Sequence, residues 1–106
     1  MTVHTIRLRA PWKRGRENDR NVWHRVFGCP SNLSTEETVR LVCHSELATG
    51  TAVLNGETLG SVPAGFEVTG KLGFRNRLVL RLDSSGEVEE GDREPPFDVS
   101  LEIHSG

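Results

Sequence analysis

Residues 97–104 read Phe-Asp-Val-Ser-Leu-Glu-Ile-His, with apolar and polar residues in strict alternation. Successive side chains of a β-strand point to opposite faces, so this period of two places Phe97, Val99, Leu101 and Ile103 on one side. The pattern predicts a strand with one face in a hydrophobic core and one in water. It decides the fold class, because the rest of the chain repeats it.

The same period recurs along the chain, and helical periodicity is almost absent. In the run from Arg77 to Asp83, Leu78, Leu80 and Leu82 share a face. Further strands are expected at Thr38–Ser45, His4–Arg9, Val22–Phe27, Thr51–Leu54 and Gly65–Val68. Short strands at this spacing are typical of a sandwich or barrel. We therefore expect an all-β fold, a single jelly-roll-like antiparallel β-sandwich of 7–9 strands.

Turn residues separate these runs. Asn55-Gly56 lies between two short apolar stretches, and this dipeptide readily takes the positive φ angles of a tight hairpin. Lys13–Asn21 is almost entirely polar and Ser84–Pro96 is acidic and rich in Gly and Pro, so both are expected to be exposed loops. At most one helical turn is expected, at Ser34–Glu37.

Length and composition fit one small domain spanning residues 1–106. Hydrophobic residues make up 35% and charged residues 26%, which suits strands that each have one wet face. No apolar stretch approaches the roughly 20 residues needed to cross a bilayer. Because the N-terminal residues lack the apolar segment of a secretory signal, we expect a cytoplasmic protein without a membrane partner.

The two cysteines, Cys29 and Cys43, are too few for a disulfide scaffold and do not form a CxxC pair. Cys43 falls on the apolar side of its strand, with Val39 and Leu41, and is expected to be a buried free thiol. A Cys29–Cys43 disulfide is the alternative if the protein is exported.

Charge is unevenly distributed although the net charge is only −2. Residues 1–25 hold seven basic and two acidic residues, a balance of +5, and residues 83–98 hold seven acidic residues and one arginine, a balance of −6. One interpretation is a basic face for an anion, or a weak head-to-tail homo-oligomer. The alternative, which we favour, is two solvated loops of opposite charge. The acidic balance and the pI of about 6.1 argue against a nucleic-acid partner.

No catalytic or metal-binding motif stands out. The four histidines, His4, His24, His44 and His104, belong to separate expected strands and lack metal-ligand spacing. No nucleophile elbow, phosphate-binding loop or dinucleotide fingerprint is present. We therefore expect no enzymatic activity, no cofactor and no metal site.

The central segment carries a resemblance to a known family. Residues 52–60 (Ala-Val-Leu-Asn-Gly-Glu-Thr-Leu-Gly) are followed by Phe66-Glu-Val-Thr-Gly-Lys-Leu72 and then by an alternating run that begins at Arg75-Asn76. Upstream lie Trp23-His-Arg-Val-Phe27 and Pro30. In order and spacing, over about residues 22–104, these motifs resemble the N-terminal sugar-binding domain of glycoside hydrolase family 2, the β-galactosidase and β-glucuronidase group.

This resemblance implies a galactose-binding-like sandwich with a binding heritage. Its motif residues have structural roles: Phe66 and Val68 point into a core, while Thr69 and Asn76 satisfy backbone groups at strand ends. The family's catalytic carboxylates belong to a separate barrel domain, so the resemblance implies no hydrolase activity.

We therefore expect a non-catalytic binding module with carbohydrate as the first ligand to test. The alternative is a structural or protein–protein interaction domain that kept the fold without sugar binding. The candidate sugar-binding residues are Trp12, as a stacking platform, with Arg14, Arg16 and Asn18 on the polar segment that follows it. Against this, Trp12 could plug one end of the sandwich, which we favour, and Trp23 is expected in the core.

Overall fold

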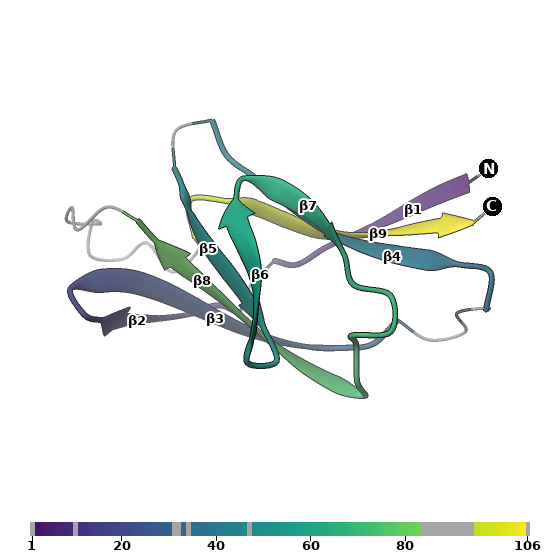
Figure 1. The fold of residues 1–106 in the computed structure, drawn as a ribbon, viewed down its shortest axis with the longest axis horizontal. Coiled ribbons are helices and arrows are strands. Elements are labelled where there is room, and N and C mark those ends of the chain that lie inside the picture. The colour runs from purple at the N-terminus through teal and green to yellow at the C-terminus, as the bar shows by residue number, and fades with distance from the viewer. Residues whose placement is uncertain are drawn as a thin grey trace.

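Nine β-strands form two antiparallel sheets that face each other in a computed structural model (Figure 1). The structure describes residues 2–9, 11–30, 33, 35–46, 48–83 and 95–105. The expected all-β sandwich is confirmed, at the upper end of the expected number of strands. Within the described residues, no helix is long and apolar enough to cross a membrane.

The upper layer in Figure 1 is a four-stranded sheet and the lower layer is a five-stranded sheet. The four-stranded sheet has the order β1 (Thr2–Arg7), β9 (Asp98–Ser105), β4 (Thr38–His44), β7 (Ala64–Glu67). The five-stranded sheet has the order β2 (Lys13–Glu17), β3 (Arg20–Gly28), β8 (Arg75–Leu82), β5 (Gly50–Leu54), β6 (Glu57–Val62). The first and last strands pair with each other, so the two chain ends lie at the same end of the sandwich.

The core lies between the sheets and consists of the side chains that the alternation predicts. On β8, Leu78 and Leu80 are fully buried and Leu82 nearly so, and on β9 Val99, Leu101 and Ile103 face them from the other sheet. Other large members are Trp23, Leu41, Leu54 and Val68. Phe66 is only partly buried and packs against the edge of this core. Cys43 is a buried free thiol, as expected, and Cys29 is an exposed one.

The hairpin predicted at Asn55-Gly56 is confirmed. Leu54 pairs with Glu57, and the two residues between them have φ angles of 51° and 84°. Both values are positive, as a two-residue hairpin turn requires.

The prediction that Lys13–Asn21 is an exposed loop is wrong. The segment forms β2 and the start of β3, joined by a second two-residue turn in which Glu17 pairs with Arg20. Asn18 and Asp19 have φ angles of 50° and 64°, which Asn and Asp tolerate better than most residues. The sequence pattern does not reveal this strand, because β2 is a sheet edge with polar residues on both of its faces and so shows no apolar alternation.

Two polar residues act at strand ends as expected. Thr69 Oγ1 accepts a hydrogen bond from the backbone N–H of Val39 at 2.8 Å. Asn76 is 1% exposed; its Oδ1 accepts from Gly73 N (2.8 Å) and Asn55 Nδ2 (3.0 Å), and its Nδ2 donates to Gly73 O (3.1 Å). Asn55 in turn bonds the backbone of Arg77 with both its N–H and its Oδ1, each at 2.9 Å. These contacts form one network, the Asn55–Asn76 clamp, which holds the β5–β6 turn against the start of β8.

Two expected features fall partly outside the described residues. Of the acidic segment Ser84–Pro96, residues 84–94 lie outside, and Pro95 is buried. Of the expected helical turn at Ser34–Glu37, Ser34 lies outside, and residues 35–36 form a turn.

Replacing Asn76 by alanine is expected to lower the free energy of unfolding by about 2–3 kcal/mol, because it removes the hydrogen bonds that this buried side chain makes to Gly73, Asn55 and the Phe27 carbonyl. Chemical denaturation measures the loss. Ser61→Ala, at an exposed position of β6, is the control and should change stability by less than about 0.5 kcal/mol. Equal stability of the two variants would show that the clamp does not stabilise the fold.

Burial raises the pKa of the Cys43 thiol to about 12, from an ordinary value of 9.0, because desolvation disfavours the thiolate. The unfolded chain would ionise near 9.0, so this group favours the folded state below pH 9 and that contribution is lost as pH rises from 9 toward 12. We expect Cys43→Ala to lose less stability than the parent protein between pH 8 and pH 10.5, measured by thermal melting.

A thiol reagent should modify only Cys29 in the native protein at pH 8, and both cysteines after unfolding. Rapid modification of both cysteines in the native state would contradict the burial of the Cys43 thiol.

Candidate functional site

A hollow of about 470 Å³ opens at one end of the four-stranded sheet, beside Trp12. We call it the Trp12 cavity. Its volume lies within the range of sites that hold small ligands, roughly 300–1,000 Å³. Strand pairing creates it: β9 lies between β1 and β4, so Ser100 has Arg7 on one side and Val42 on the other, and Asp98 has His44 beside it. Paired residues point to the same side of a sheet, and these point away from the core.

The apolar wall of the cavity comes from the segment in which the chain leaves β1 and crosses to the other sheet. Leu8 N–H donates to Val99 O at 2.9 Å, which continues the contact between β1 and β9 past the end of β1. Trp12 then turns inward, and its indole Nε1 donates to Leu8 O at 3.1 Å. Phe97, also buried, lines the cavity with Trp12. Two aromatic side chains therefore contribute to one hollow.

The polar rim of the cavity carries Arg7, Arg9, His44, Asp98 and Ser100. The backbone at Arg9 is fixed, because its carbonyl accepts a hydrogen bond from Arg25 Nε on β3 at 2.7 Å. Within the described part of the chain, no hydrogen bond or ion pair engages the side chains of Arg7, Arg9, His44 or Asp98. The rim thus offers donors from two guanidinium groups and an acceptor from one carboxylate to a ligand.

The structure separates the residues that the sequence grouped as a sugar site. Trp12 is 6% exposed and belongs to the core cluster, so it plugs the sandwich, as the favoured alternative held, and presents no open face for a sugar ring to stack on. Arg14 and Arg16 lie on β2, opposite Trp23 and Asn21, and Asn18 lies in the turn that follows. None of these three lines the Trp12 cavity, because β2 carries them away from Trp12 along the edge of the other sheet.

Sequence reasoning missed Arg7, Arg9, His44, Asp98 and Ser100. Alternation alone places Arg7, His44, Asp98 and Ser100 on the outward faces of their strands. What it cannot supply is the pairing of β9 with both β1 and β4, since these strands are far apart in the sequence.

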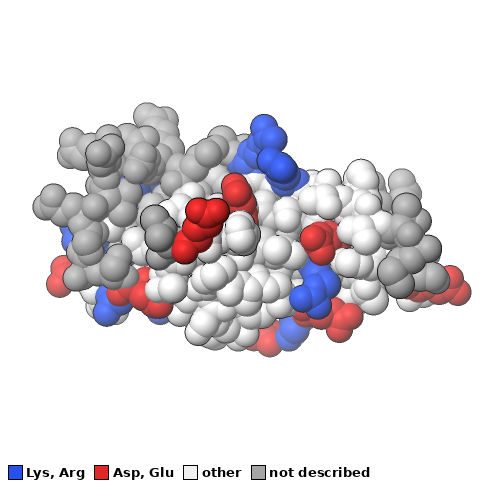
Figure 2. All heavy atoms as spheres, turned by 90° about the horizontal axis from the view of Figure 1, so that it is seen from above, with Lys and Arg blue, Asp and Glu red and all other residues white. Residues whose placement is uncertain are grey.

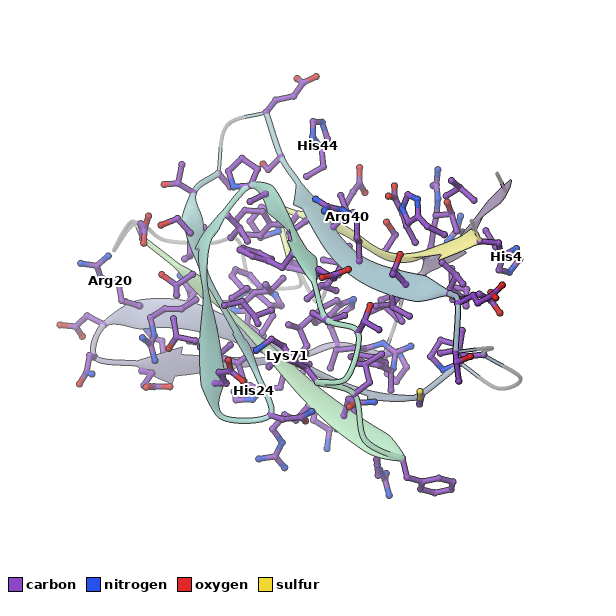
Figure 3. The ribbon with its side chains drawn as sticks, turned by 45° about the vertical axis from the view of Figure 1, so that its right-hand side comes forward. His4, Arg20, His24, Arg40, His44 and Lys71 are labelled. Atoms are coloured by element: carbon purple, nitrogen blue, oxygen red, sulfur yellow. The ribbon has the colours of Figure 1, made fainter. Side chains whose placement is uncertain are left out.

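The histidines do not gather into a site. Figure 3 shows His4, His24 and His44 well apart, on β1, β3 and β4. His104 on β9 lies beside Glu102, with 3.1 Å between Nε2 and Oε1. Among the described residues, no group of three or more His, Cys, Asp or Glu side chains could hold a metal ion.

Charge is mixed on one broad side of the molecule. Figure 2, which views the molecule from the top of Figure 1, shows acidic and basic side chains interspersed among uncharged ones. A different arrangement occurs on the outward face of the five-stranded sheet, where a second hollow of about 510 Å³ is lined by Pro11, Lys13, His24, Val26, Arg75 and Arg77. We call this second hollow the basic groove. The two hollows share no lining residue.

Comparisons with known proteins bear on the fold. Neither a protein-family model nor a curated protein matches the sequence. Among solved structures, the crystal structure of an FMN-binding beta-glucuronidase from Facaelibacterium prausnitzii L2-6 matches 97% of this chain with a TM-score of 0.66 and 15% sequence identity. The chain spans 23% of the length of that protein. The nine-stranded sandwich therefore has the fold of a portion of a glycoside hydrolase.

Proposed function

We propose that this chain is a non-catalytic binding module and that its ligand is a carbohydrate held in the Trp12 cavity. The observation that carries the proposal is a hollow of about 470 Å³ whose rim holds polar side chains that have no partner in the described part of the chain, with the nearly buried Trp12 and Phe97 among its lining residues. A sugar offers hydroxyl groups that both donate and accept hydrogen bonds. The rim can supply the matching donors from Arg7 and Arg9 and the acceptor from Asp98.

Two lines of similarity support carbohydrate as the ligand class. The motifs from Trp23 to Ile103 resemble those of the N-terminal sugar-binding domain of glycoside hydrolase family 2. The fold matches a portion of a beta-glucuronidase. We propose that the chain corresponds to that sugar-binding domain, although function resides in the site and not in the fold.

The proposal assigns no hydrolysis to the chain. Glycosidases generally use two carboxyl groups on either side of the bond that breaks. Among the described residues that line the Trp12 cavity, Asp98 is the only carboxylate. The motif residues Asn55, Thr69 and Asn76 are occupied in backbone hydrogen bonds and are not available for chemistry.

A glycan array followed by titration with tryptophan fluorescence tests this function, since Trp12 lines the cavity and a ligand there would change its environment. We expect at least one oligosaccharide to bind, and Arg7→Ala to weaken that binding roughly tenfold or more, because charged hydrogen bonds to the ligand are lost. Arg16→Ala, an exposed arginine on β2 outside the cavity, is the matched control and should bind as the parent does.

Thermal melting of both variants shows whether they fold. An array on which no glycan binds the folded protein, or equal binding by Arg7→Ala and the parent, would refute the carbohydrate function. The second candidate is a protein–protein interaction domain that kept the fold without sugar binding. The basic groove favours it, and that surface does not depend on the Trp12 cavity.

A further inference from the structure

The basic groove lies on the outward face of the five-stranded sheet, across β2, β3 and β8. Lys13 on β2 pairs with His24 on β3, and Val26 on β3 pairs with Arg77 on β8. Arg75, two residues before Arg77, pairs with Gly28, which carries no side chain. These pairings point the five side chains of Lys13, His24, Val26, Arg75 and Arg77 to the same side of the sheet.

The groove has a single sign of charge. Within the described residues, the side chains of Lys13, Arg75 and Arg77 have no hydrogen bond or ion pair. Further along the same face, Arg81 shows the contrast: its Nη2 lies 2.8 Å from Glu17 Oε1. The sheet thus pairs one arginine of β8 internally and leaves two beside the groove for an external anion.

Apolar side chains accompany these cations. Val26, in the groove, is 38% exposed. Phe74, which directly precedes Arg75, is 96% exposed, and its carbonyl accepts from Cys29 N at 3.3 Å. A phenylalanine held in water by an ordered backbone gains nothing from packing within the chain, and exposed aromatic side chains are enriched where proteins meet partners.

We propose that the basic groove binds an acidic polypeptide segment in extended conformation. Arg75 and Arg77 lie two residues apart on one strand, a separation of roughly 6.6 Å. Carboxylates at alternate positions of an extended peptide repeat at the same distance, so two consecutive members of that series can reach both arginines. Lys13 supplies a further cation across the groove, and Val26 contacts an apolar side chain that lies on the same face of the peptide as the carboxylates, at the next alternate position.

The apolar contacts favour a polypeptide over a nucleic acid or a sulfated polysaccharide. A sulfated polysaccharide would bind mainly through charge, and a single-stranded nucleic acid through charge and base stacking on an aromatic side chain, so neither needs the aliphatic Val26. A peptide can present carboxylates and apolar side chains together. The proposal is independent of the sugar-binding function, since the two hollows have no lining residue in common.

Fluorescence anisotropy with a labelled hexapeptide, Glu-Ser-Glu-Ser-Val-Ser, whose two glutamates and valine share one face in the extended conformation, tests the proposal on the full chain at physiological salt. We expect this peptide to bind, and Arg77→Glu to weaken binding about tenfold, because attraction becomes repulsion. The matched control is Arg16→Glu, the same change of charge at another exposed strand position outside the groove. Arg77→Gln provides a milder change should Arg77→Glu prove unstable, and Val26→Ser is expected to weaken binding severalfold.

A peptide of the same composition with adjacent acids, Glu-Glu-Ser-Ser-Val-Ser, should bind more weakly, because its two carboxylates point to opposite sides of the extended chain. Absence of binding by the alternating peptide, or equal losses in Arg77→Glu and Arg16→Glu, would overturn the proposal. Tighter binding of a heparin fragment or a single-stranded oligonucleotide that Val26→Ser leaves unchanged would overturn it in favour of a polyanion. A dimer of the parent protein that dissociates in Arg77→Glu, without any peptide binding, would overturn the proposal and indicate that a second copy of this chain occupies the groove. Arg7→Ala should leave peptide binding unchanged, so this test and the glycan test can fail separately.

Discussion

Burial of one face of β8 is the interaction on which the sandwich depends. β8 lies in the middle of the five-stranded sheet, and its Leu78, Leu80 and Leu82 belong to the same buried cluster as Leu101 of β9 in the opposite sheet. Burying each leucine contributes about 1.5–3 kcal/mol, several times the net contribution of a surface ion pair. A register slip by one residue would point all three leucine side chains toward water. This strand therefore also fixes the register of its own pairing with β3 on one side and with β5 on the other. The Asn55–Asn76 clamp then holds the start of β8 in that register.

The parts of the fold that could be predicted from the sequence are those in which a local pattern and the burial agree. Residues 97–104 and 77–83 alternate because one face is buried, and Asn55-Gly56 marks its turn by conformational preference alone. Residues 13–21 have no such signal: the side chains of β2 point to water or past the sheet edge, so polarity suggested a loop. The Asn18-Asp19 pair was the available sign, since both residues tolerate positive φ. If Asn18-Asp19 is interpreted as a hairpin turn in the same way as Asn55-Gly56, it predicts the second hairpin.

The candidate site was less predictable, for a topological reason. Trp12, Arg14, Arg16 and Asn18 were grouped because they are neighbours in the sequence, yet the turn of the chain at Trp12 sends the tryptophan inward while β2 runs along the other sheet. Arg7, Ser100 and His44 come together only through β9, which pairs with the first strand and the fourth at once. Alternation predicts which way each side chain points. It does not predict which strands are neighbours, and a site made from three strands needs both.

This distinction changes where a binding surface should be sought in such a domain. Binding residues of proteins lie disproportionately on loops that a rigid scaffold positions. In the structure, both hollows are built mainly from the outward side chains of paired strands, with Trp12 and Phe97 reaching one of them from the core. Outward positions are free of the packing constraint that β8 imposes on inward ones, so Arg75 and Arg77 can carry charge while Leu78 and Leu80 cannot. The same period of two that makes the core therefore also spaces charged groups evenly along a rigid sheet, which favours ligands that are themselves extended.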